Sequence, residues 1–213
     1  MSVQLPPDRL FVLVTGPSGV GKDTIIQQIV AEDTAFRFLT TATTRPMRPG
    51  EVDGEHYFFL TREEFLKRIG QGEVLEYSEH YGNFYGALLA PLQDLMAQGY
   101  DVIKEPNWTG TAQIQERIPD NILKILILPP TYEDLILRHQ ARSELMGKPV
   151  DWSRLEKIKI DFKHIDEADY IFTNDDMIGS KLTDYDHMVV NDDLDKAVAE
   201  VKQHIHNARQ KRG

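Results

Sequence analysis

The chain has 213 residues, of which 41% are hydrophobic and 27% charged, and its formal net charge is −10. This length suits one domain, or one domain with mobile subdomains, and the negative charge argues against general nucleic-acid binding. The absence of cysteine excludes disulfides, thiolate metal sites and cysteine nucleophiles. No run approaches the roughly 18 apolar residues of a membrane span and no signal peptide is evident, so we expect a cytoplasmic protein without membrane contacts.

A glycine-rich loop follows the first predicted strand. Phe11 to Val14 form a short apolar run, residues 16–22 read GPSGVGK, and residues 24–32 have apolar positions at helical spacing. The glycines bring backbone N–H groups close to an anion, the helix adds its positive N-terminal end, and Lys22 supplies a point charge for the β- and γ-phosphates. We therefore predict an ATP-phosphate site at Gly16, Ser18, Gly19, Val20, Gly21, Lys22, Asp23 and Thr24.

The next strand is predicted over residues 36–44, and a loop with two prolines and two glycines follows over residues 45–54. Arg45 and Arg48 lie three positions apart in this extended loop, so their guanidinium groups can converge on one anion. Arginine suits phosphate because its planar fork binds two oxygens at once. On these residues alone, a solvated basic loop remains an alternative.

Short strands and helices then alternate. Residues 56–60 read as a strand, Thr61 and Glu64 form a capping box that starts a helix, and residues 73–78 alternate as a strand. An aromatic turn over residues 82–86, a helix over 88–98 and a strand over 100–104 follow. Polar residues then cluster over 105–110, at the carboxyl end of that strand, which is the usual ligand edge of an open α/β sheet.

The last third of the chain continues the alternation. Residues 122–128 form a nearly continuous apolar strand, as expected in a parallel sheet that helices cover on both faces. Thr131 should cap a helix with Arg138 and Arg142, residues 143–151 read as a loop, and residues 152–166 as a helix with Arg154. Two similar segments, 169–176 and 186–193, precede a final helix from Leu194. We expect a mostly parallel α/β sheet with helices on both faces.

Several motifs in this order resemble the guanylate kinases, nucleoside monophosphate kinases of the P-loop class. They are GPSGVGK (16–22), TTRPMRPGEVDGEHYFF (43–59), EFL (64–66), GEVLEYSEHYGNFYG (72–86), LPP (128–130) and NDDLDKA (191–197), and the resemblance covers about residues 11–203. It implies a P-loop NTPase-type core over about 9–39, 99–137 and 168–213. It also implies a subdomain that binds the nucleoside monophosphate (NMP) over about 40–98 and a lid over about 138–155.

The resemblance further implies phosphoryl transfer from ATP, with Mg²⁺, to GMP or dGMP. Glu76 would then read guanine, since a carboxylate accepts from both N1–H and the exocyclic amine, and Asn191 would contact adenine. The implied catalytic residues are Lys22, Arg45, Arg138, Arg142 and Arg154. The implied GMP-binding residues are Thr41, Arg45, Arg48, Glu51, Tyr57, Glu76, Tyr85, Glu105 and Asn107. Small-molecule nucleotides are the expected partners, and the oligomeric state is left open.

Four positions depart from the family pattern. Asp23 replaces a small or hydroxyl residue, and it could bind Mg²⁺ or simply favour the helix N-terminus. Ala87 replaces a guanine-contacting Ser or Thr, Asn107 replaces an Asp, and Asn174 belongs to an insertion that could form an extra hairpin or be a local duplication without a role. A related phosphokinase, such as one for ribose 1,5-bisphosphate, is therefore an alternative. A catalytically silent binding module for phosphopeptides is another.

Overall fold

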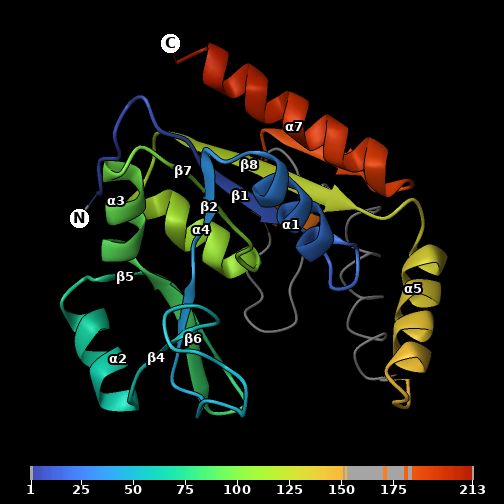
Figure 1. Cartoon of the computed structure of the whole chain (residues 1–213), viewed down its shortest axis with the longest axis horizontal. Coiled ribbons are helices and arrows are strands. Elements are labelled where there is room, and N and C mark those ends of the chain that lie inside the picture. The colour runs from blue at the N-terminus through green and yellow to red at the C-terminus, as the bar shows by residue number, and fades with distance from the viewer. Residues whose placement is uncertain (1, 151, 153–169, 172–179, 182–183, 213) are drawn as a thin grey trace.

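A parallel sheet forms the core of the molecule (Figure 1). The computed structural model describes residues 2–150, 152, 170–171, 180–181 and 184–212. Within these ranges the core sheet has five strands, all in parallel register with their neighbours. In spatial order they are β11 (His187–Val190), β8 (Ile122–Leu128), β1 (Phe11–Thr15), β7 (Asp101–Lys104) and β2 (Phe36–Phe38).

Helices cover both faces of this sheet, as predicted. The side chains of β1 alternate: Val12 and Val14 pack in one cluster with α1 (Lys22–Glu32) and α7 (Leu194–Gln210). Phe11 and Leu13 pack in a second cluster on the opposite face, with α3 (Leu89–Ala97) and α4 (Trp108–Arg117). A strand buried on both faces gives an almost continuous apolar run, which is why β1 and β8 were recognisable in the sequence.

A second, smaller sheet lies below the core sheet in Figure 1. Its strand order is β4 (Phe58–Phe59), β3 (Thr41–Thr43), β6 (Asn83–Leu88) and β5 (Val74–His80). Helix α2 (Arg62–Gly70) packs on it through the buried Phe65, whose ring stacks on Phe84. Thr61 and Glu64 form the predicted capping box at the start of α2.

Two sequence predictions for this region are wrong. The single strand predicted over residues 36–44 is two strands in different sheets, because Phe38 pairs with β7 whereas Thr41 pairs with Ala87 of β6. The turn predicted over residues 82–86 is mostly strand β6, and the left-handed turn residues are Tyr81 and Gly82. The boundary between β2 and β3 depends on partners far away in sequence, so local composition did not reveal it. Strand β6 instead forms a tight hairpin with β5, in which Asn83 pairs with His80.

Helices flank the remaining strands. Helix α4 was not predicted, although Asn107 caps it by accepting from the backbone N–H of Gly110. Helix α5 (Tyr132–Leu145) starts at the predicted cap Thr131 and continues three residues into the predicted loop. Strand β9 (Tyr170–Ile171) pairs antiparallel with β10 (Ser180–Lys181), which is compatible with the extra hairpin, one of the two possibilities raised for this segment beside a local duplication without a role. Of the helix predicted over 152–166 only Trp152 is described, in a helical conformation, and Asn174 lies outside the described residues.

Candidate functional site

The glycine loop between β1 and α1 forms an anion cradle. Gly21 is the N-cap of α1 in the left-handed conformation (φ 103°), so it offers no side chain to the first N–H groups of the helix. Gly16 passes so close to β8 that a Cβ there would collide with the carbonyl oxygen of Ile127. Unpaired N–H groups and the helix dipole together favour a bound phosphate at this end of α1.

Lys22 is anchored at the mouth of this loop. Its Nζ donates to the carbonyl oxygens of Gly16 at 2.8 Å and of Pro17 at 3.0 Å, and it lies 3.1 Å from Oε1 of Glu105. Burial raises the pKa of Glu105 to about 7, and a hydrogen bond with Asp23 adds to this shift, whereas the Lys22 charge opposes it. The loop thus places one buried ammonium beside two interacting carboxyl groups.

These groups line a cleft of ≈ 550 Å³ next to α5. Arg138 of α5 donates to the carbonyl oxygens of Val20, at 3.3 Å, and Asn191, at 2.6 Å. Asn191 itself is buried and donates to the Val20 oxygen at 2.7 Å. The residues that line the cleft are Ser18, Gly19, Gly21, Lys22, Asp23, Thr24, Gln27, Glu105, Arg138, His139 and Arg142.

The cleft therefore brings together most of the residues predicted to bind ATP, with Arg138 and Arg142 from the predicted lid. The predicted boundary at residue 138 falls within α5, which is continuous from Tyr132. His139 was not predicted, and its Nε2 lies 3.1 Å from the carbonyl oxygen of Ser18. Arg154, a predicted catalytic residue, lies outside the described residues.

A second cluster of charged and aromatic groups lies in the loop beside β3 and β4. The guanidinium of Arg45 contacts both carboxylate oxygens of Glu51, at 2.6 and 3.0 Å, and it lies over the Tyr57 ring at 5.4 Å. The rings of Tyr57 and Tyr85 meet edge to face at 6.2 Å. Hydrogen bonds from Arg45 and from the backbone N–H of Arg48 lower the pKa of Glu51 to about 2. Glu51 thus holds the side chain of Arg45 and the backbone of Arg48, the two arginines predicted to bind an anion.

A third cluster is buried between the two sheets. Glu76, only 5% exposed, lies 3.3 Å from Nζ of Lys104, which also donates to Oγ1 of Thr41 at 3.3 Å. The first turn of α4 packs on the same carboxylate, since a Cβ on Gly110 would lie 2.7 Å from Oε2 of Glu76. Thr41, Glu76 and Asn107 are thus neighbours, as the resemblance implied. Lys104 was missed, although a lysine ending the apolar run of β7 was a visible signal.

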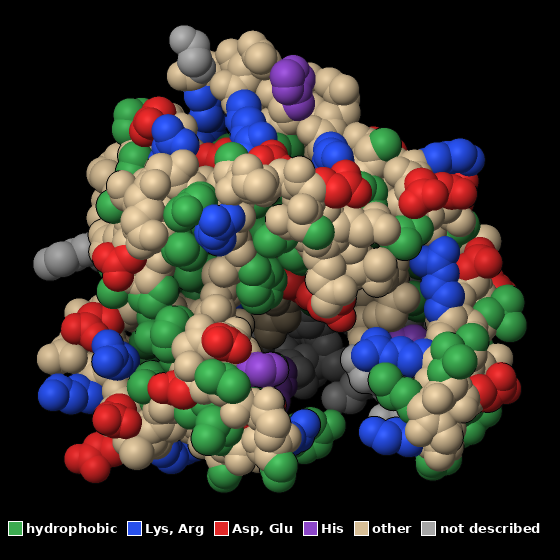
Figure 2. Space-filling model, viewed as in Figure 1, with side chains coloured by type: hydrophobic (Ala, Val, Ile, Leu, Met, Phe, Trp, Pro, Cys, Tyr) green, Lys and Arg blue, Asp and Glu red, His purple; other side chains and the backbone are tan. Residues whose placement is uncertain are grey.

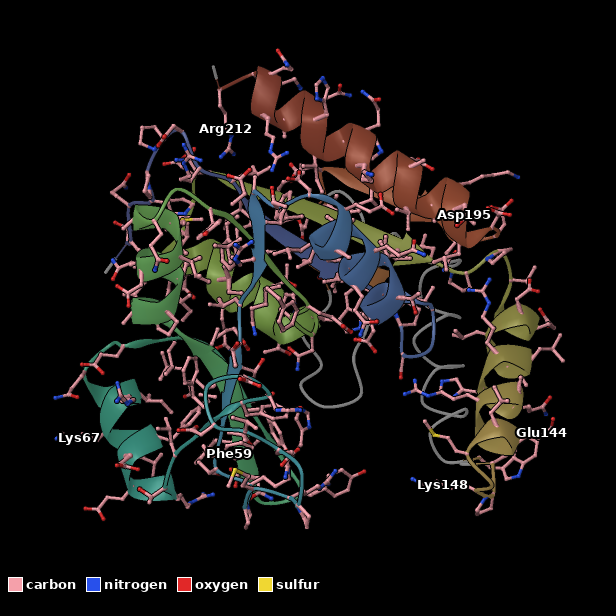
Figure 3. All side chains as sticks on the ribbon, in the orientation of Figure 1. Phe59, Lys67, Glu144, Lys148, Asp195 and Arg212 are labelled. Atoms are coloured by element: carbon pink, nitrogen blue, oxygen red, sulfur yellow. The ribbon has the colours of Figure 1, made fainter. Side chains whose placement is uncertain are left out.

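The surface is hollowed between the second sheet and α5, and basic side chains gather on the α5 side of the hollow (Figure 2). Figure 3 shows Phe59 in the second sheet on one side, and Glu144 and Lys148 at the far end of α5 on the other. The glycine loop with Lys22 and the loop with Arg45 thus place cationic side chains at two separate points, which suits a reaction between two phosphorylated molecules. None of the described helices is long and apolar enough to cross a membrane.

Comparison with known proteins gives a consistent result. The family model described as guanylate kinase matches residues 8–179. A guanylate kinase from Symbiobacterium thermophilum is 40% identical over 196 residues, which cover 92% of this chain and 84% of that protein. One from Lactococcus lactis subsp. lactis is 39% identical and covers 78% of this chain and 80% of its own. A crystal structure of guanylate kinase from Anaplasma phagocytophilum shares the fold, with a TM-score of 0.63 at 23% identity over 94% of this chain and 86% of that one.

Proposed function

The chain belongs to the guanylate kinase family, and we infer from this that it is an ATP-dependent phosphotransferase that converts GMP to GDP. The observation that supports this reaction best is the presence of two separate clusters that could bind phosphate, one at the start of α1 and one beside the second sheet. One is the glycine loop with Lys22, and the other is the loop in which Glu51 holds Arg45. Neither alternative raised by the sequence, a ribose bisphosphate phosphokinase or a silent binding module, is favoured by the relatives.

The glycine loop is proposed as the site of the ATP phosphates. Lys22 would bind the β- and γ-phosphates, and Asn191, buried against the loop at Val20, would contact adenine. Arg138 and Arg142 project from α5 into the same cleft and would neutralise charge on the transferred group. Arg154, outside the described residues, would complete this set.

Oxygen ligands near Lys22 fit a magnesium ion. Asp23, Thr24 and Glu105 line the same cleft, and Mg²⁺ commonly takes one or two carboxylates together with substrate phosphates. Within the described part of the chain, no group of three or more acidic or histidine side chains could hold a metal by itself. We therefore propose Asp23 as a partial ligand, together with Glu105, which the resemblance implied as a GMP-binding residue but which lies beside Lys22. Bound there, the ion would neutralise phosphate charge in the transition state.

The acceptor is proposed to bind along the second sheet. Arg45, Arg48, Tyr57 and Tyr85 would hold the phosphate of GMP, and Glu51 would keep Arg45 in place. At the buried end, Glu76 would accept from guanine N1–H and the exocyclic amine, with Thr41 and Asn107 beside it. Adenine lacks this pair of donors, so Glu76 would set the choice of base.

The transfer itself needs alignment more than acid–base chemistry. The attacking oxygen belongs to a phosphate whose second pKa is about 6, so it is largely ionised near neutral pH. The protein's contribution is to align the two phosphates, neutralise their charge and exclude water, which would otherwise accept the phosphoryl group. Closure of a lid over residues 138–155 would provide that exclusion, and we place the reaction in the cytoplasm.

A coupled assay of ADP formation tests this function. The purified chain is incubated with ATP and Mg²⁺, and the acceptors are GMP, dGMP, AMP, UMP, dTMP and ribose 1,5-bisphosphate, each in turn. We expect GMP and dGMP to be the preferred acceptors by kcat/KM. Preference for the ribose bisphosphate would favour the alternative phosphokinase, and the absence of turnover with every acceptor would contradict the proposed enzyme.

A further inference from the structure

Lys104 is a buried cation that the reaction described above leaves without a role. It ends β7 of the core sheet and is 2% exposed, and lysines are almost never buried to this degree unless they are paired. Its Nζ contacts Glu76 and Thr41, each at 3.3 Å. Both of those residues belong to the second sheet, so Lys104 makes a polar contact from the core sheet to the proposed base site.

The register of the second sheet explains why these groups converge. Thr41 of β3 and Glu76 of β5 both pair with Ala87 of the strand between them, β6. Directly paired residues project from the same face of a sheet, so the three side chains form one row. Lys104 contacts both ends of this row. The row is also the place where the resemblance implied recognition of guanine.

The two oxygens of the Glu76 carboxylate have different surroundings. Oε1 faces the ammonium of Lys104 at 3.3 Å, and Oε2 lies near the first turn of α4, where a Cβ added to Gly110 would be 2.7 Å away. An ionised carboxylate offers about four lone-pair sites. The ion pair with Lys104 therefore leaves acceptor sites for two N–H donors of a base.

We propose that Lys104 is a positioning residue that sets the specificity of the acceptor site, because it holds the carboxylate of Glu76 correctly turned toward guanine. This proposal rests on GMP being the acceptor. Without the ammonium, the buried carboxylate would lose the ion pair that fixes its orientation, and its fit to the two donors of guanine would weaken. The ability to distinguish guanine from adenine would then fall.

Replacing Lys104 by methionine tests the proposal, because Lys104→Met keeps an unbranched side chain of similar length without the charge. The matched control is Lys124→Met, which changes a lysine of β8 that donates to Gln115. We expect Lys104→Met to raise KM for GMP at least tenfold and to leave KM for ATP within twofold. The preference for GMP over AMP should fall at least tenfold, and the control should match the unaltered protein.

A double-mutant cycle with Glu76→Gln separates positioning from a merely structural link between the sheets. If Lys104 acts through Glu76, the double variant Glu76→Gln/Lys104→Met has the same KM for GMP as Glu76→Gln alone, within twofold. Because the double variant contains neither buried charge, it gives this answer even if Lys104→Met alone does not fold.

Three results would overturn the proposal. The first two are an unchanged KM for GMP in Lys104→Met, and an equal rise in KM for GMP and KM for ATP in that variant. The third is a KM for GMP in the double variant that rises by the product of the two single-variant effects. Failure of the proposed function is a separate result. It would appear as a lack of preference for GMP over AMP in the unaltered protein, before any substitution is made.

Discussion

At the scale of single residues, Lys22 is the group on which phosphate binding depends most. Its Nζ is held by two backbone oxygens and by Glu105, so its position is fixed before any nucleotide arrives. We expect Lys22→Ala to lower kcat by at least a hundredfold with little effect on unfolding by urea, since removing a positioned charge weakens transition-state stabilisation by several kcal/mol. Lys67→Ala, on the exposed face of α2, is the control (Figure 3). Near-normal turnover of Lys22→Ala would refute the phosphate site.

Glu105 should make stability depend on pH. Its pKa rises from 4.5 to about 7 mainly because of burial, so the folded state binds this proton more tightly than the unfolded state does. The stability that it contributes is complete below about pH 4.5 and is lost as pH rises through 7. Between pH 5 and pH 8, the ligand-free protein should lose about 2 kcal/mol more unfolding free energy than Glu105→Gln. Urea titrations of both proteins at pH 5 and pH 8 measure this difference. An equal change in unfolding free energy in the unaltered protein and in Glu105→Gln would contradict it.

The residue types at the site were largely predictable, but their partners were not. The glycine loop and Lys22 follow from spacing and context, and Thr41, Glu76 and Asn107 lie together as the resemblance implied. Lys104 escaped notice because a lysine in a sequence is presumed exposed. Only its burial and its contacts with Glu76 and Thr41 of the second sheet show otherwise.

At the scale of elements, the contact between α4 and β5 shapes the proposed base site. The first turn of α4 approaches Glu76 so closely that a methyl group on Gly110 would lie 2.7 Å from Oε2. That oxygen ends a side chain that can move, so Gly110→Ala should cost the fold little, under about 1 kcal/mol, while it displaces the carboxylate. We expect KM for GMP to rise severalfold, with KM for ATP unchanged.

A matched glycine provides the control for this prediction. Gly70 ends α2 and has nothing within 4 Å of an added Cβ, so Gly70→Ala should leave both KM values unchanged. Steady-state kinetics of the two variants, with GMP and ATP varied in turn, give the comparison. Equal KM values for GMP in Gly110→Ala and Gly70→Ala would mean that α4 does not position Glu76.

Element boundaries were predictable where the signal is local. The strand β8, the cap at Thr61 and the start of α7 are as predicted, because apolar runs and capping residues lie within a few positions of the boundary. The separation of β2 from β3 was not predicted, because it depends on pairing with β7 in one case and with β6 in the other. Helix α4 was missed because its polar first turn resembles a ligand loop.

At the scale of the whole molecule, Arg209 fastens the C-terminal helix to the core. Its Nε donates to Asp101 of β7 and its Nη1 to Asp33 after α1, both at 2.7 Å, and its guanidinium lies 4.7 Å from the centre of the Phe36 ring. Asp101 is only 4% exposed and also accepts from the backbone N–H of Leu10 at 2.8 Å. One side chain of α7 therefore joins segments from three parts of the sequence.

Loss of this contact should weaken the fold. Arg209→Ala would leave Asp101 as a buried carboxylate without its cation, and we expect a loss of about 2–3 kcal/mol in the free energy of unfolding. Arg68→Ala is the control, since it breaks an exposed pair with Glu73 and should cost less than about 1 kcal/mol. Urea denaturation measures both, and equal losses would show that Arg209 contributes no more than a surface ion pair.

The overall plan of the molecule was predictable because it repeats one pattern. Strands that alternate with helices, and a glycine loop after the first strand, predict a parallel sheet with a phosphate site at its edge. The second sheet was expected only as a subdomain, from the resemblance. Its strands β3 and β6 pair across as many as 46 positions, as between Thr41 and Ala87, and sequence patterns do not reveal such pairings.

The central claim is that the donor phosphates bind at Lys22 while the acceptor binds on the second sheet. A crystal structure with GMP and a non-hydrolysable ATP analogue tests it most directly. The account predicts that the GMP phosphate lies within hydrogen-bonding distance of Arg45 and Arg48, with guanine against Glu76. An acceptor phosphate bound far from that arginine pair would contradict it.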